Sequence, residues 1–293
     1  MLGDIPLDVW YDNPLQVAQD KKPVTGGAGK ANGADKKASD TAGESAVKAP
    51  AAEPETKSAG GDDWAALLDK ETLENEVKQV KQGLANAFMS VNKYNANYKG
   101  DIPMHGSVLA VLAELAGKLP ESVSWKEKAP QVRDLAADVV NKSKGLGAGS
   151  FDPAKKTYDT LTELLSGNTP PDLPQAAPST EFSEVAKRSG LMKRMDKAHE
   201  WMKQTVTTEE AFKKNSEEVL HQARMLAVLS KVVGAPGYNS TDEEDYQGFV
   251  KRMVDANKQI IQAAKEGNFA AYSDASNKNQ RNCDECHSSY RFE

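Results

Sequence analysis

Apolar side chains recur at steps of three and four residues along most of the chain after Trp64, the spacing that predicts amphipathic α-helices. In the first part of this region the pattern predicts four helices, separated by proline, glycine and short polar runs. Asp152 and Pro153 are expected to open the fourth, as a capping side chain followed by a proline in the first turn. These helices are expected from Trp64 to Val91, from Asp101 to Leu115, from Pro120 to Val140 and from Asp152 to Leu165.

After a proline-rich break at Thr169–Pro174, the same plan recurs. Two short matches support an internal repeat: Leu109–Leu112 and Leu226–Leu229 have the same sequence, and Gly149–Phe151 resembles Gly267–Phe269. The second set of helices is predicted from Thr180 to Lys203, from Thr207 to Leu229, from Thr241 to Ile261, and from Phe269 into the last residues.

The predicted fold class is therefore all-α, with two tandem four-helix bundles at residues 63–168 and 178–293. Residues 1–20 contain a short apolar run, Ile5–Tyr11, which is too small to fold alone. Residues 21–62 are rich in Ala, Gly, Lys and Pro and have almost no large apolar side chains. Such a segment cannot offset its ordering entropy by burial, so it is predicted to be a disordered linker.

Composition limits the functions that the chain can have. A net charge of −6 and a pI near 5.5 argue against nucleic acid as a partner. No apolar run is long enough to predict a membrane span. The start, Met1–Asp4, lacks the basic and apolar segments of a signal peptide. We also find no paired carboxylates, activated nucleophile or phosphate loop, so we do not expect an enzyme.

The most informative motif is Cys283-Asp284-Glu285-Cys286-His287 near the C-terminus. Cys-x-x-Cys-His is the attachment motif of c-type haem: two thiols form thioethers with the porphyrin and the histidine ligates the iron. On a helix the three residues lie at i, i+3 and i+4 and share one face. A disulfide or half of a zinc site are the alternatives. A zinc site requires about four ligands, and Cys283 and Cys286 are the only two cysteines of the chain.

This C-terminal motif, followed by Tyr290 and Arg291, resembles the class II c-type cytochromes, the cytochrome c-prime family with its low-spin His/Met relatives. The resemblance implies a four-helix bundle with one covalently bound haem c on its last helix. It also implies a periplasmic or otherwise exported protein, so we expect a leader that was removed or that precedes Met1. In the first repeat Leu165, Asn168 and Thr169 align with the motif, so we expect one haem and a haemless first bundle.

In the low-spin relatives a methionine near the start of the first helix supplies the sixth iron ligand, between an arginine and a lysine. Arg188–Lys193 resembles that pattern, so Met192 is the expected sixth ligand. Met195 and His199 remain alternatives, and a methionine row at helical spacing is also typical of a core. By the same resemblance Leu191 would form the distal wall of an open site, and Tyr290 would pack on the haem edge. Arg188 and Arg291 would reach the haem propionates.

The leading functional hypothesis is a mono-haem electron carrier whose redox partner is unknown. One alternative is a five-coordinate, cytochrome c-prime-like protein that binds small gases such as NO or CO. The other is a haem-stapled interaction module. Pairing is expected either between the two bundles of one chain or in a homodimer.

Overall fold

The computed structural model describes residues 64–291, apart from 121–122 and 179–180. The predicted N-terminal segment (1–20) and linker (21–62) therefore lie outside the described residues. In the described part, all regular structure is helical, with eleven α-helices and one 3-10 helix, which confirms the all-α prediction. None of these helices combines the length and apolarity needed to cross a bilayer.

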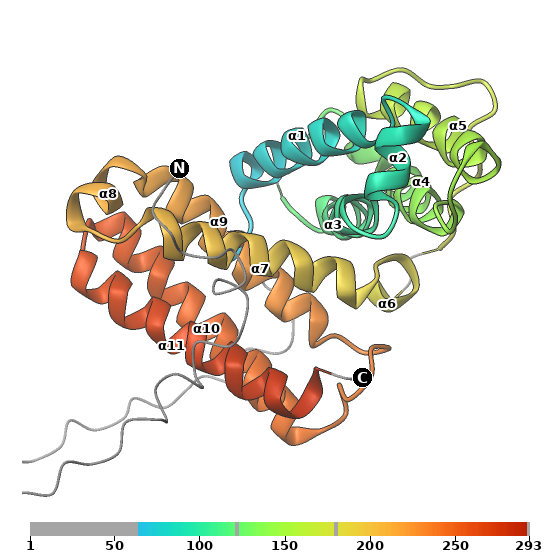
Figure 1. Ribbon diagram of the computed structural model, residues 1–293. Helices are drawn as coiled ribbons and strands as arrows, with labels where there is room; N and C mark the ends of the chain where they lie inside the picture. The colour runs from blue at the N-terminus through green and yellow to red at the C-terminus, as the bar shows by residue number, and fades with distance from the viewer. Residues whose placement is uncertain (1–63, 121–122, 179–180, 292–293) are drawn as a thin grey trace, which may run out of the picture. The chain divides into compact units, whose positions relative to one another are not determined.

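The first set of helices surrounds α3, which is buried along most of its length. α1 and α4 both pack against α3, and α5 packs against α4 (Figure 1). Asp69 begins α1 by accepting a hydrogen bond from the backbone N–H of Thr72 at 2.9 Å. The elements are α1 (Lys70–Ala87), α2 (Val91–Asn97), α3 (Asp101–Ala116), η2 (Lys126–Lys128), α4 (Ala129–Lys142) and α5 (Ala148–Leu165).

Two boundaries in this set differ from the sequence prediction. The long helix expected from Trp64 to Val91 is divided, because α1 ends at Ala87 and Ser90 caps a separate α2. The fourth helix does not begin at Asp152 and Pro153: α5 starts at Ala148, and Pro153 lies inside it. Gly147, with φ of 80°, turns the chain before Ala148, so the helix begins where glycine permits a left-handed backbone.

In the second set α7 packs against α9, α9 against α10, and α10 against α11. The turn between the last two helices uses Gly267 in the left-handed region, and Asn268 caps α11 by accepting from the N–H of Ala271 at 3.0 Å. The elements are α6 (Phe182–Val185), α7 (Arg188–Thr205), α8 (Glu209–Lys214), α9 (Ser216–Val233), α10 (Glu244–Glu266) and α11 (Phe269–Tyr290).

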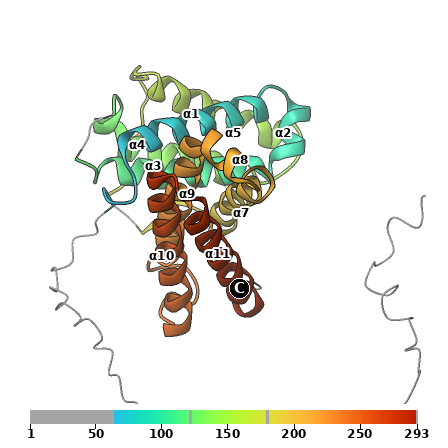
Figure 2. The same cartoon turned by 90° about the vertical axis from the view of Figure 1, so that its left-hand side faces the viewer.

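The two sets meet through α7 and α9, which lie between the first set and the α10–α11 pair (Figures 1 and 2). α7 packs against α3, and α9 contacts α1. The approach of α7 to α3 is close at Gly190, where an added Cβ would lie 2.6 Å from the carbonyl oxygen of Pro103. The backbone N–H of Lys187 also donates to Ser107 Oγ at 3.0 Å. The described residues between 64 and 291 thus belong to one compact unit.

The helix registers of the two sets can be compared directly. α7 begins and ends 118 residues after α1 (188 − 70 and 205 − 87), close to the spacing of the two sequence matches. The last helices differ. α11 continues to Tyr290, whereas α5 ends at Leu165, so Asn168 and Thr169 lie beyond its end.

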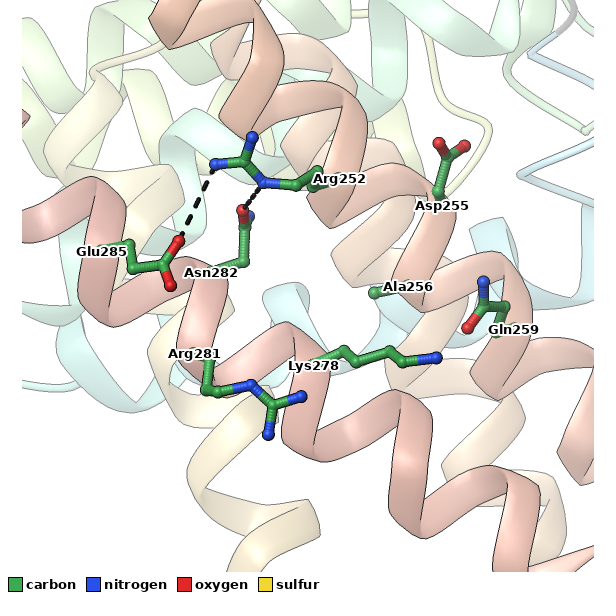
Figure 3. Close-up of a pocket in the computed structure, with 8 residues that line it drawn as sticks. All are labelled: Arg252, Asp255, Ala256, Gln259, Lys278, Arg281, Asn282 and Glu285. Atoms are coloured by element: carbon green, nitrogen blue, oxygen red, sulfur yellow. Dashed lines mark hydrogen bonds and ion pairs between the residues drawn. The ribbon is translucent and has the colours of Figure 1, made fainter. Parts of the chain in front are cut away.

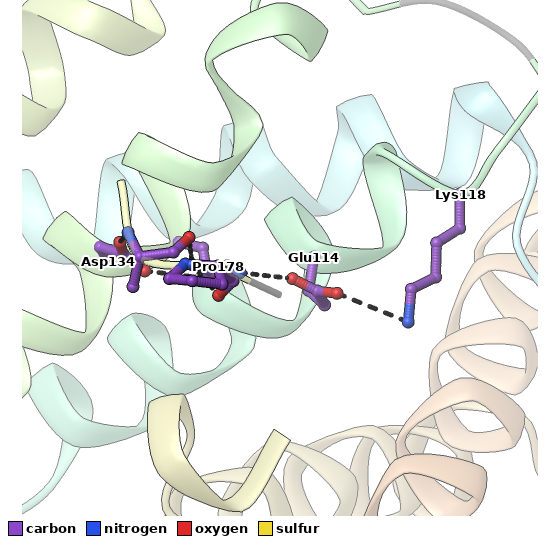
Figure 4. Close-up of polar contacts among 6 residues, drawn as sticks. Glu114, Lys118, Asp134 and Pro178 are labelled. Atoms are coloured by element: carbon purple, nitrogen blue, oxygen red, sulfur yellow. Dashed lines mark hydrogen bonds and ion pairs between the residues drawn. The ribbon is translucent and has the colours of Figure 1, made fainter. Parts of the chain in front are cut away.

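Arg133 on α4 bonds to the segment that joins the two sets. Figure 4 shows Glu114, Asp134 and Pro178 of this group of polar contacts. The side chain of Arg133 is buried and donates to Glu114 Oε2 at 2.8 Å and to the carbonyl oxygens of Ala177 and Pro178 at 2.8 and 3.2 Å. Asp134 accepts from the N–H of Ala177 at 2.7 Å. The connection is therefore held against α4 by charge-assisted bonds.

Candidate functional site

The structure brings four of the eight predicted site residues to one cavity between α7 and α11: the two cysteines, His287 and Met192. Cys283, Cys286 and His287 line it from α11, because their i, i+3 and i+4 spacing places them on one helix face. Across the cavity, α7 contributes Met192, Met195 and His199. The remaining lining residues are Leu226 of α9, Met253 of α10, Asp196 of α7, and Asn279, Gln280 and Asp284 of α11.

The cavity wall is rich in sulfur. Both cysteines are free thiols, with Cys286 buried and Cys283 half-buried. The thioether side chains of Met192, Met195 and Met253 share the same cavity. This arrangement places two candidate attachment groups beside an imidazole and opposite soft sulfur donors, which is the ligand chemistry that a c-type haem requires.

Burial keeps these thiols protonated at neutral pH. Burial, together with the smaller effects of the neighbouring Asp284, Cys286 and Asp196, raises the pKa of Cys283 to about 11. Burial also raises the pKa of Cys286, although the positive charges of Arg188 and Arg252 oppose the effect. Within the described ranges, no three His, Cys, Asp or Glu side chains gather as a metal-binding group.

His199 and Gln280 close one side of the cavity. His199 Nε2 contacts Gln280 Oε1, so this pair links α7 directly to α11. The other ring nitrogen of His199, Nδ1, is buried and has no hydrogen-bond partner among the residues that the structure describes. A buried nitrogen without a partner destabilises the fold, so this atom is a polar group that a bound ligand would be able to satisfy.

Two buried asparagines line or support the cavity and were not predicted from the sequence. Asn257 Nδ2 donates to the carbonyl of Met253 at 2.8 Å and to Asn279 Oδ1 at 3.2 Å. Asn279 lies one helical turn before Cys283 on the same face of α11. That i, i+4 spacing was the available signal, but a single asparagine in a polar helix does not reveal its burial.

Leu191 and Arg188 do not line the cavity. Leu191 is fully buried in the core. The guanidinium of Arg188 lies over the rings of Tyr238 and Tyr246, with 5.5 and 5.3 Å to their centroids. It also donates to the carbonyl of Asn239. Arg188 thus contacts the segment between α9 and α10 and the first turn of α10.

Tyr290 packs on α10. Its ring meets Tyr246 and Phe249 edge-on, at centroid distances of 5.2 and 6.0 Å, and its hydroxyl donates to Glu243 Oε2 at 3.1 Å. Arg291 follows the end of α11 and is exposed. Neither residue lines the cavity.

The donor set of the cavity fits a haem, but its volume is about 110 Å³. Pockets for drug-sized ligands usually measure roughly 300 to 1,000 Å³. Haem would therefore fit only if the cavity widened. The contact between His199 and Gln280 would have to break for the cavity to widen. The packing of α7 on α9 and of α11 on α10 does not depend on that contact.

A second hollow lies between α10 and α11 and is strongly charged (Figure 3). It measures about 300 Å³, and Arg252 crosses it to reach Asn282 at 2.8 Å and Glu285 at 3.9 Å. Lys278 and Arg281 also border it. The carboxylates of Asp255 and Glu285 border it too, so charges of both signs line this hollow.

No protein-family model matches the chain, and no curated protein or solved structure matches it either.

Proposed function

We propose that this chain is a mono-haem c-type cytochrome that transfers electrons and is not an enzyme. The proposal rests on one observation: the Cys-x-x-Cys-His residues of α11 and two methionines of α7 line the same cavity. In the sequence, α7 lies near the beginning of the second helix set and α11 at its end. In the cavity, the two thiols and the imidazole of α11 lie opposite the two thioethers of α7. The resemblance to class II c-type cytochromes belongs to this proposal, as does export to the periplasm.

In this proposal Cys283 and Cys286 would hold the haem through thioether bonds, and His287 and Met192 would ligate its iron. Haem, when bound, would supply an iron centre that gains and loses one electron, and a thioether opposite an imidazole raises its potential. The chain's own residues would hold and shield that centre. Leu226 and Met253 contribute apolar wall, and the buried Asn279 adds a polar group beside the attachment helix.

The test is the absorption spectrum of the full chain, exported with a leader to a compartment that has haem-attachment machinery. A covalently bound, low-spin haem with the far-red charge-transfer band of a methionine–iron bond is the expected result. Cys283→Ser combined with Cys286→Ser should abolish covalent attachment. A chain that acquires no covalent haem under these conditions would refute the proposal.

Met192→Ala and Met195→Ala form a matched pair, since both residues line the cavity from α7. We expect Met192→Ala to remove the far-red band and Met195→Ala to retain it. Loss of the band only in Met195→Ala would transfer the ligand role to Met195.

A five-coordinate haem that binds small gases is the second candidate, favoured by the apolar Leu226 and Met253 in the cavity wall. It predicts a high-spin spectrum in the unmodified chain and a shift when carbon monoxide is added. The two candidates therefore give opposite spectra.

A further inference from the structure

A cluster of buried charged and polar side chains lies where the two helix sets meet. Glu76 of α1 is 1% exposed, and Arg194 of α7 is 6% exposed. Arg194 Nε and Nη2 donate to the two carboxylate oxygens of Glu76 at 2.6 and 2.7 Å, in a bidentate pair. From α9, His221 Nε2 lies 2.9 Å from Glu76 Oε2, and Gln222 Oε1 accepts from Arg194 Nη1 at 2.8 Å. The cluster thus joins α1, α7 and α9.

Among the described residues, this cluster is more deeply buried than the other ion pairs between the sets; Asp69, which pairs with Arg224 of α9, has a side chain that is 40% exposed. Lys193 and Lys197 also reach across from α7, to Asp101 on α3, but those ion pairs are substantially exposed. Exposed pairs are weak because water and salt screen them. A buried, bidentate pair tolerates little change in geometry, and its best-attested role is to specify the register of packed helices.

Arg194 lies on the opposite side of α7 from the cavity. Met192, Met195 and His199 face α11, whereas Arg194 faces α1 and α9. One residue corresponds to a rotation of about 100° around a helix. Rotation of α7 by that amount would break the bond to Glu76 and move the methionines away from the cavity. The rotational setting of the cavity wall is therefore coupled to this bond.

Arg194 follows Glu76 by 118 residues, the same interval that separates α7 from α1. The two residues thus occupy equivalent positions in the two helix sets. A symmetric pairing of two copies of either set through this face would bring Glu76 against Glu76, or Arg194 against Arg194. Burying like charges is strongly unfavourable, so the pair favours the first set as the partner of the second.

We propose that Arg194 is a positioning residue: its bond to Glu76 makes the first helix set a support for α7 and holds Met192 and Met195 opposite Cys283. This inference rests on the proposed function for the identity of the bound group. The geometry that it asserts can also be measured in the chain without haem. The haemless first half then has a definite role, because it supplies the carboxylate that sets one wall of the site.

The experiment compares Arg194→Met with Arg133→Met in the full chain. Arg133 is a matched control because it is equally buried and ion-paired, at 2.8 Å to Glu114, but it bonds to α3 and to the connecting segment rather than to α7. Both variants lose a buried guanidinium and retain a long apolar side chain. Far-ultraviolet circular dichroism verifies that each keeps its helices.

The first readout is alkylation of Cys283 in the haem-free chain, followed by peptide mapping. Cys283 and Asp196 of α7 line the same cavity, so the accessibility of this thiol reports on the position of α7. Arg194→Met should increase the alkylation rate by about tenfold, through easier local opening, and Arg133→Met should stay within about twofold. Equal rates in Arg194→Met and the unmodified chain, or an equal increase in both variants, would overturn the proposal.

The second readout is the far-red methionine–iron band of the haem-loaded chain. Arg194→Met should lose the band and Arg133→Met should keep it, since only the first releases α7. If the unmodified chain acquires haem but has no band, methionine ligation fails, and the alkylation rates still decide the role of Arg194. If Arg194→Met does not fold, Glu76→Gln replaces it, because the amide keeps the shape of the carboxylate without its charge.

Discussion

Glu76→Gln is a direct test of how much the buried cluster stabilises the fold. Burial alone would raise the pKa of Glu76, but hydrogen bonds and charges from Arg194 and His221 outweigh it and lower the pKa from 4.5 to about 2. A carboxylate with a depressed pKa stabilises the folded state when it is ionised. Substitution by glutamine removes that charge and leaves the guanidinium of Arg194 buried beside an amide.

The magnitude follows from the shift in pKa. Lowering the pKa of Glu76 from 4.5 to about 2, at about 1.36 kcal/mol for each tenfold change in proton affinity, corresponds to roughly 3 kcal/mol at pH 7. This value agrees with the roughly 3 to 5 kcal/mol lost when one partner of a buried ion pair is removed. We therefore expect Glu76→Gln to lower the free energy of unfolding by about 3 kcal/mol at pH 7.

The pH dependence provides a sharper test than the magnitude. Because the pKa of Glu76 is lower in the folded state, its contribution is complete above about pH 4.5 and declines as the pH falls towards 2. At pH 3, which lies between these two pKa values, less than half of the stabilisation remains. The difference between the unmodified chain and Glu76→Gln should therefore shrink by about half or more between pH 7 and pH 3.

Urea unfolding followed by circular dichroism at both pH values measures this difference. Glu74→Gln is the control, because Glu74 on the same helix is 52% exposed and lies 3.9 Å from Lys70, and it should change stability by less than about 0.5 kcal/mol. An unfolding midpoint unaffected by Glu76→Gln at pH 7 would contradict the stabilising role of the Glu76 carboxylate. So would a difference that is the same at pH 3 as at pH 7.

Two further predictions concern packing and thiol chemistry. Gly190→Ala should destabilise the chain by roughly 1 to 3 kcal/mol in thermal or urea unfolding, because its Cβ would meet the Pro103 carbonyl at 2.6 Å; Gly149→Ala, with nothing within 4 Å, should be neutral or stabilising by up to about 1 kcal/mol. In the haem-free chain, the pKa of about 11 for Cys283 should slow its alkylation at pH 8 by about a hundredfold relative to the urea-unfolded chain. Comparable rates in the two states would show that α7 does not shield the thiol.

The sequence predicted the helical elements well because their signals are local. The three- and four-residue steps from Leu73 to Leu84 correspond to buried positions on α1, and the spacing of Cys283, Cys286 and His287 already required a shared helix face. The errors are local as well. Asp152 and Pro153 have the chemistry of a helix start, but Gly147 begins α5 earlier, and a proline near the beginning of a helix is tolerated.

The sequence alone determined the all-α content and the placement of two thiols and an imidazole on one face of the last helix. It could not determine what faces them. Only the packing of α7, α9, α10 and α11 brings Met192 and Met195 into the same cavity. The same packing places Arg188 over Tyr238 and Tyr290 against Tyr246, outside the cavity. Glu76 and Arg194 are separated by 118 residues and resemble ordinary surface charges in the sequence. Their burial depends on the contact between the helix sets, a property of three-dimensional packing that no local pattern encodes.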